Sequence, residues 1–111
     1  MSGSKILIGN DTPEQGIAWA NMLKTAGAFA VTRKPNGLVL LQYVKECSMP
    51  EIIIIEAKMA GLDAVGFINE LKKLGELPTI IVTADYQMSS LEDELMFLGI
   101  KAFMVKPFEP S

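Results

Sequence analysis

One stretch of the chain constrains its fold more than any other. Four consecutive isoleucines, Ile52 to Ile55, end in the carboxylate of Glu56. A short apolar run of β-branched residues bounded by loop-like residues is typical of a strand that is buried on both faces, as in a parallel sheet. Ligands of open α/β sheets bind at the carboxyl ends of the strands. The sequence therefore predicts that Glu56 lies at the edge of the sheet where a functional site is expected.

Strand and helix signals alternate along the rest of the chain. Apolar residues recur at helical spacing in the segments between the expected strands, and this pattern predicts one helix in each. The order βαβαβαβαβ predicts a doubly wound, five-stranded parallel sheet with helices on both faces. The expected strands are residues 5–9, 29–32, 52–55, 78–84 and 102–105. The stripes of the last three helices are Leu40, Tyr43, Val44 and Cys47; Ala64, Phe67, Ile68 and Leu71; and Leu91, Leu95 and Leu98.

Capping and turn residues mark the ends of several helices. Thr12 with Gln15, and Ser89 with Glu92, each have the spacing of a capping box. Residues 35–37, Pro-Asn-Gly, have turn chemistry. The first helix is expected to end at Gly27.

Length indicates a single domain, expected over residues 5–108. Residues 1–4 are expected to be a disordered terminus or a cloning remnant, and the pattern breaks off at 109–111, where a final helix would begin. We therefore expect that helix to be absent or truncated. Its absence would leave an apolar face open to another chain or to a second copy of this one.

Composition excludes several classes of function. The chain has no histidine, so histidine-based acid–base catalysis, histidine metal sites and a phosphohistidine relay are excluded within it. The single cysteine, Cys47, excludes an intramolecular disulfide and is expected to be a small buried residue on an apolar helix face. A net charge of −3 gives no general attraction for nucleic acid or anionic membrane. No run is long enough to span a bilayer and no signal peptide is present, so a cytoplasmic protein is expected.

Four of the five expected strands are followed by, or end in, a residue suited to phosphate or metal chemistry. These residues are Asp11, Glu56, Thr83 and Lys106. Because the carboxyl ends of parallel strands share one edge, the four side chains are expected to meet in one cleft. A single charged residue at a strand end is more often a solvated loop entry, whereas four at these positions are a strong signal.

With this pattern the chain resembles the receiver domain of two-component response regulators, similar to the chemotaxis regulators, over residues 5–108. The resemblance implies a flavodoxin-like receiver fold that acts in signalling and is not an enzyme. It places two acids after the first strand, a phospho-accepting aspartate after the third, a hydroxyl residue after the fourth and a lysine after the fifth. The positions in this chain are Asn10, Asp11, Glu56, Thr83 and Lys106, with Phe103 as the switch aromatic.

The chain departs from the family pattern at the residues that matter most for phosphorylation. In the family an aspartate attacks phosphorus while acids and a backbone carbonyl hold Mg²⁺. Glu56 replaces that aspartate, and its extra methylene moves the carboxylate by roughly 1.5 Å. Asn10 removes one acid, and Ala60 and Ala64 replace the usual proline and glycine. Any Mg²⁺ site is therefore expected to be weak. It would involve Asp11, Asn10, Glu56 and Lys58.

Several interpretations of Glu56 stay open. Its carboxylate either mimics the phosphoryl group, paired with Lys106 or Thr83, or belongs to a retired site on a phosphorylation-independent scaffold, or is a solvated leftover. The alternatives are a functional Mg²⁺-dependent phospho-acceptor, an engineered Asp-to-Glu change, and a flavodoxin-like ligand binder, which is disfavoured because a phosphate-cradling loop is lacking.

The resemblance also implies the kind of partner. It points to a sensor kinase, an effector or an output domain, which would bind through the fourth helix, the fifth strand and the missing helix. A homodimer through the open face is a further expected use. Direct binding to nucleic acid or to a membrane is not expected.

Overall fold

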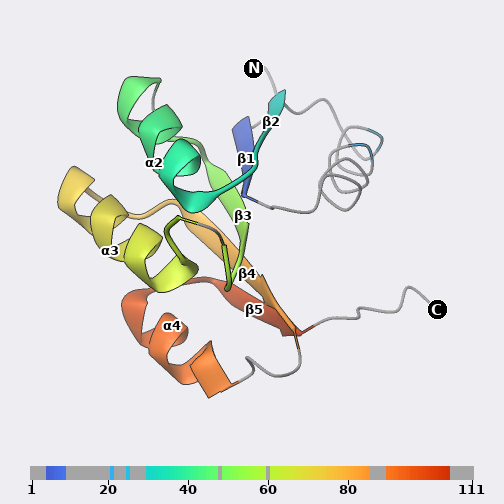
Figure 1. Cartoon of the computed structure of the whole chain (residues 1–111), viewed down its shortest axis with the longest axis vertical. Helices are drawn as coiled ribbons and strands as arrows, with labels where there is room; N and C mark the ends of the chain where they lie inside the picture. Colours follow the sequence, from blue (N-terminus) through green and yellow to red (C-terminus); the bar gives the residue numbers. More distant parts are fainter. Residues whose placement is uncertain are drawn as a thin grey trace.

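The structure is a computed structural model that describes residues 5–9, 21, 25, 30–47, 49–59, 61–85 and 90–105. Five strands pair in parallel in the order β2-β1-β3-β4-β5 (Figure 1). This is the order of a doubly wound sheet of the flavodoxin type. The predicted five-stranded parallel sheet is therefore confirmed. The strands are β1 (Lys5–Gly9), β2 (Ala30–Lys34), β3 (Ile52–Glu56), β4 (Thr79–Ala84) and β5 (Ala102–Val105).

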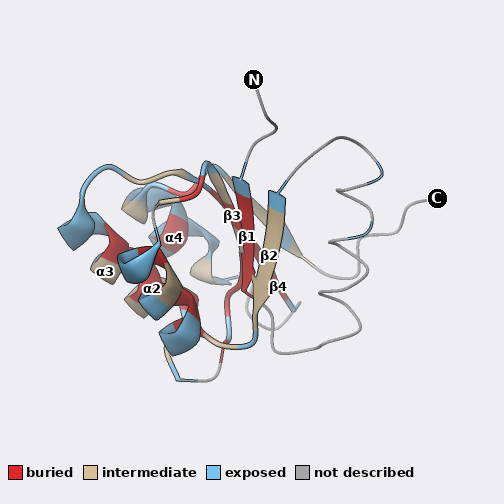
Figure 2. Ribbon diagram, turned by 90° about the horizontal axis from the view of Figure 1, so that it is seen from above, coloured by how far each residue is buried: buried red, intermediate tan, exposed pale blue. Residues whose placement is uncertain are grey.

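Three helices lie together on one face of the sheet (Figure 2). They are α2 (Gly37–Glu46), α3 (Ala64–Leu74) and α4 (Glu92–Leu98). Of the predicted first helix, only Asn21 and Thr25 are described, both are helical, and the Thr25 hydroxyl donates to the Asn21 carbonyl over 2.9 Å. The capping box at Thr12 and the expected truncated helix after residue 108 lie outside the described residues. No helix of the described ranges has the length and apolar character needed to cross a bilayer.

The main core lies between the sheet and these three helices. Ile53 and Ile55 of β3 are fully buried there, together with the stripe of α3. The alternate residues Ile52 and Ile54 project from the opposite face and are half-buried. The four-isoleucine run thus forms a strand covered most completely on the α2–α4 face. The α3 stripe is Ala64, Phe67, Ile68 and Leu71, and all four are fully buried.

Four local predictions differ from the structure. Strand β2 continues to Lys34, because Lys34 pairs with Gly9 at the end of β1. Asn36 is the N-cap of α2 and not only a turn residue, since its side chain accepts from the Val39 amide over 2.9 Å. Cys47 is exposed, because α2 ends at Glu46 and Cys47 occupies the C-cap beyond the buried stripe.

The fourth difference is the start of α4. Glu92 is the first helical residue, and the N-cap is Leu91, which makes no side-chain capping bond. The predicted capping box needed Glu92 three residues into the helix, so this prediction was wrong. Ser89 lies outside the described residues. The apolar stripe of α4 is confirmed, with Leu95 buried and Leu91 and Leu98 packed against the core.

Helix α2 is packed tightly against the loop that follows β3. A Cβ atom on Gly37, the first residue of α2, would lie 1.9 Å from the Leu62 carbonyl oxygen. The same loop ends at Asp63, whose side chain caps α3 by accepting from the Gly66 amide over 2.9 Å. The Ala64 amide also donates to the Ala57 carbonyl over 3.1 Å. Close backbone packing and two capping bonds therefore fix the course of residues 57–63.

Gly37→Ala is expected to destabilise the protein by about 2 kcal/mol or more, because backbone and not a flexible side chain must move to relieve the clash. Gly66→Ala is the matched control. Its Cβ would meet the Cδ1 atom of Leu62 at 2.7 Å, the end of a side chain that can rotate. Alanine also gains about 1 kcal/mol of helix propensity over glycine. Urea unfolding monitored by circular dichroism measures both variants. Equal destabilisation would contradict the backbone contact.

The exposed position of Cys47 gives a second test. The thiol of the folded protein is expected to react stoichiometrically with a disulfide reagent such as dithionitrobenzoate, at a rate close to that of the urea-unfolded chain. A rate slower by about two orders of magnitude in native buffer would return Cys47 to the apolar face that the sequence predicted. Exposure and thiolate character together set such rates, so both measurements are made at one pH.

Candidate functional site at the carboxyl ends of the strands

Glu56 and Thr83 lie side by side at the carboxyl edge of the sheet. Glu56 is the last residue of β3, and its Cα partner in the β3–β4 ladder is Thr83. Paired residues of a parallel ladder project from the same face of the sheet. The sequence had placed both residues at strand ends, and the structure brings these two together.

Both side chains are buried although they are polar. Glu56 is 8% exposed and Thr83 is 2% exposed. The Thr83 hydroxyl lies 3.5 Å from the Ile55 carbonyl, to which it donates, and the Thr83 carbonyl accepts from the Ala57 amide over 2.7 Å. Glu56 also has a polar or electrostatic interaction within the protein. Because a buried carboxylate is costly without such interactions, Glu56 is part of an organised edge and not a solvated loop entry.

The strands that lead to the other predicted site residues end at the same edge. Gly9, the last residue of β1, is the Cα partner of Ile55, which directly precedes Glu56. A Cβ atom on Gly9 would lie 2.7 Å from the Leu40 side chain, so glycine permits the close packing of β1 against α2. Val105, the last residue of β5, is the partner of Ala84. Asn10, Asp11 and Lys106 follow these strands in sequence and lie outside the described residues.

Phe103 is not beside Glu56 and Thr83. It pairs with Val82 and packs against the core on the α2–α4 face, whereas Glu56 and Thr83 project from the opposite face. Phe103 is half-buried. The site and this aromatic residue are therefore connected through the sheet and not by direct side-chain neighbourhood.

Two further charged residues lie near this edge. Lys58, a predicted participant in the metal site, is exposed two residues after Glu56. Asp85 directly follows β4, is exposed and has a polar or electrostatic interaction of its own. The sequence analysis did not select Asp85, because a charged residue after a strand is ordinary and carries no distinguishing signal.

The described residues test the expected metal site only in part. They hold no group of three cysteine, aspartate or glutamate side chains close enough to bind a metal ion. The described part of the edge thus does not by itself form a Mg²⁺ site, and no chemical step is derived through the ion. The weak site involving Asn10 and Asp11 stays a prediction. A buried carboxylate beside a threonine hydroxyl is suited to receiving or imitating an anionic group that a cation balances.

Comparison with known proteins gives relatives along nearly the whole chain. The sequence is 27% identical over 109 residues to the chemotaxis protein CheY of Thermotoga maritima, a match that covers 98% of this chain and 90% of that protein. It is 30% identical over 109 residues to the "Probable transcriptional regulator ycf27" of Guillardia theta, covering 96% of this chain. The match spans 41% of that relative's length, so most of the relative lies beyond it.

Solved structures agree with the fold. Full-length FixJ from B. japonicum superposes with a TM-score of 0.86 at 24% identity, over 98% of this chain and 53% of that chain. A response regulator receiver domain protein from Clostridium thermocellum gives a TM-score of 0.86 at 20% identity, over 96% of this chain and 84% of that one. The sequence matches the response regulator receiver domain family over residues 6–111. Since this range is nearly the whole chain, the protein belongs to the family of response regulator receiver domains.

Proposed function

We propose that this receiver domain works as a protein-interaction module that is not phosphorylated under ordinary conditions. The observation that carries the proposal is the buried glutamate at the acceptor position, held beside Thr83 by the β3–β4 ladder. A glutamate there presents its carboxylate roughly 1.5 Å further from the backbone than an aspartate would. Misplacing a nucleophile by about 1 Å can cost on the order of a hundredfold in rate.

The surroundings of Glu56 leave little freedom to correct this displacement. The chain on either side of it is fixed, because Ile55 is fully buried and the Ala57 amide is bonded to Thr83. Asn10, in place of a second acid, further lowers the charge available to hold Mg²⁺. Together these features support loss of phosphotransfer in a domain that keeps its fold.

The proposal predicts the outcome of direct phosphorylation. The protein incubated with Mg²⁺ and acetyl phosphate is expected to show no gain of a phosphoryl group by intact mass. Glu56→Asp is expected to gain a detectable fraction, because the shorter side chain restores the position of the nucleophile. Adding Asn10→Asp to this variant is expected to raise that fraction, since the second acid strengthens the ion site.

Glu56→Gln is the matched control, because it keeps the length of the side chain and removes the nucleophile. A stoichiometric, hydroxylamine-sensitive adduct on the unaltered protein that Glu56→Gln abolishes would overturn the proposal. It would show that Glu56 itself accepts phosphate and would support the alternative of a functional phospho-acceptor.

Two forms of the module remain distinct. In one, the Glu56 carboxylate substitutes for a phosphoryl group and holds the domain in its signalling state. In the other, the site is retired and Glu56 is only structural. Burial of the carboxylate beside the Thr83 hydroxyl supports the first form, because a retired carboxylate has no need to remain dehydrated.

The mimic form predicts a response at a distance. Glu56→Gln keeps the size of the side chain and removes its charge, so amide chemical shifts are expected to change in α4 and at Phe103 as well as around residue 56. Glu76→Gln, at an exposed position after α3, is the charge-matched control and is expected to change shifts only locally. Shift changes confined to the neighbours of residue 56 would favour the passive scaffold.

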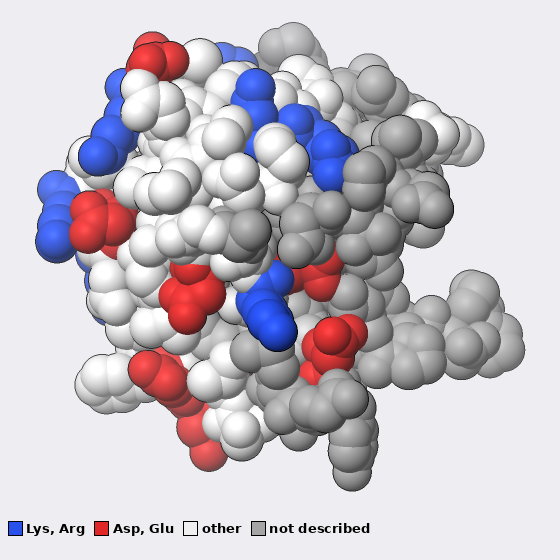
Figure 3. Space-filling view, viewed as in Figure 1, with Lys and Arg blue, Asp and Glu red and all other residues white. Residues whose placement is uncertain are grey.

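The surface of α4 and β5 has the character of a protein-binding site. Phe97 is 87% exposed, and Met96 and Met104 are also exposed. The first turn of α4 carries Glu92, Asp93 and Glu94. Figure 3 shows acidic side chains gathered over the lower part of this view, where α4 lies, while basic ones are scattered elsewhere. An apolar surface edged by acids supports binding to a protein and not to nucleic acid.

The remaining parts of the proposal concern context. We take residues 5–108 as the receiver domain and a sensor kinase, effector or output domain as its partner. A homodimer through the apolar face of the sheet is a further arrangement consistent with the half-buried Ile54. A cytoplasmic location follows from the signalling role proposed for the domain. We assign no enzymatic activity to it.

A further inference from the structure

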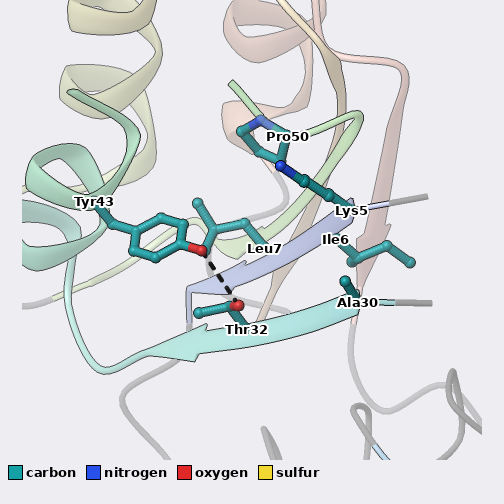
Figure 4. Close-up of a pocket in the computed structure, with 7 residues that line it drawn as sticks. All are labelled: Lys5, Ile6, Leu7, Ala30, Thr32, Tyr43 and Pro50. Carbon is teal, nitrogen blue, oxygen red and sulfur yellow. Dashed lines mark hydrogen bonds between the residues drawn. The ribbon is translucent and has the colours of Figure 1, made fainter. Parts of the chain in front are cut away.

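A small pocket opens at the opposite end of the sheet from Glu56. It has a volume of about 80 Å³ and lies at the amino ends of β1 and β2, under α2 (Figure 4). Its lining residues come from β1, β2, α2 and the residue that leads into β3. They are Lys5, Ile6, Leu7, Ala30, Thr32, Tyr43 and Pro50.

Two hydroxyl groups face each other across this pocket. The Tyr43 hydroxyl lies 3.5 Å from the Thr32 hydroxyl (Figure 4). Hydrogen bonds between hydroxyls are usually about 2.7–2.8 Å long, so this contact is weak. Both groups are half-buried, and both therefore keep the capacity to donate to a stronger acceptor.

The charges around the pocket favour an anion. Lys5 is a lining residue, and the Lys34 ammonium lies 4.9 Å from the centre of the Tyr43 ring. The nearest described acid is Glu51, whose carboxylate accepts from the Lys5 backbone amide over 3.2 Å and does not line the pocket. Two ammonium groups against one carboxylate give a local excess of positive charge in a chain whose net charge is −3.

The rest of the lining is apolar and sets the size of a ligand. Leu7 is fully buried and Pro50 is buried, so they form an apolar wall beside the two hydroxyls. A cavity of about 150 Å³ accommodates benzene, so one of this volume fits about five heavy atoms. A molecule of that size with one anionic end and a short alkyl end matches both parts of the lining.

We propose that this pocket binds short-chain aliphatic carboxylates such as propionate. The carboxylate accepts hydrogen bonds from the Tyr43 and Thr32 hydroxyls and is attracted by the Lys5 ammonium, while the alkyl end packs against Leu7 and Pro50. This site is separate from the Glu56–Thr83 edge and does not depend on the phosphorylation state of the domain.

The test is a titration of the full-length ¹⁵N-labelled protein with sodium propionate, followed by amide chemical shifts. Saturable shifts are expected at residues 5–7, 30–32 and 43, with a millimolar Kd. Tyr43→Phe is expected to weaken binding about tenfold, since a bond to a charged group is lost. Lys5→Met is expected to weaken binding about threefold, as for an exposed charge. Lys72→Met, an exposed lysine on α3, is the control and leaves the Kd unchanged.

Three controls make the result decisive. Sodium chloride at the same ionic strength, and neutral propionamide, are expected to give no saturable shifts at these residues. Ala30→Leu fills the pocket from β2 and is expected to abolish binding while thermal unfolding shows a folded protein. Equal shifts with chloride or propionamide, an unchanged Kd in Tyr43→Phe, or unchanged binding to Ala30→Leu would each overturn the assignment, leaving a pocket that holds only water.

Discussion

The in-register pairing of β3 with β1 and β4 is the constraint on which the rest of the structure depends. It places Ile53 and Ile55 in the core against α3, and it aligns Glu56 with Thr83 at the edge of the sheet. A shift of one residue would exchange the two faces of β3 and move the buried isoleucines out of the core. The burial that stabilises the domain thereby also fixes the geometry of its site.

The loop after Glu56 is held by a second set of contacts. Gly37 allows α2 to approach the Leu62 carbonyl closely, and Asp63 caps α3 at the end of the same loop. A loop that is anchored at both ends transmits little freedom to the residue that precedes it. This rigidity suits a domain whose glutamate substitutes for a phosphoryl group better than one in which a nucleophile must adjust its position.

The two ends of the sheet offer different chemistry. The carboxyl edge presents a buried acid beside a hydroxyl, and the amino end presents two hydroxyls and a lysine around an apolar pocket. Helix α2 spans both regions, because Gly37 contacts the loop after Glu56 and Tyr43 lines the pocket. A ligand at the amino end and the state of the carboxyl edge therefore have one rigid element in common.

The sequence by itself determined the number, type and order of the elements. The isoleucine run and the α3 stripe are local patterns, and both were predicted correctly because burial of one face imposes a period on nearby residues. Only the tertiary structure decided that Cys47 is exposed, that α4 begins without a capping box, and that Thr83 is the partner of Glu56 while Phe103 lies on the other face. These properties depend on where a helix stops and on strand register, which contacts between distant parts of the chain determine.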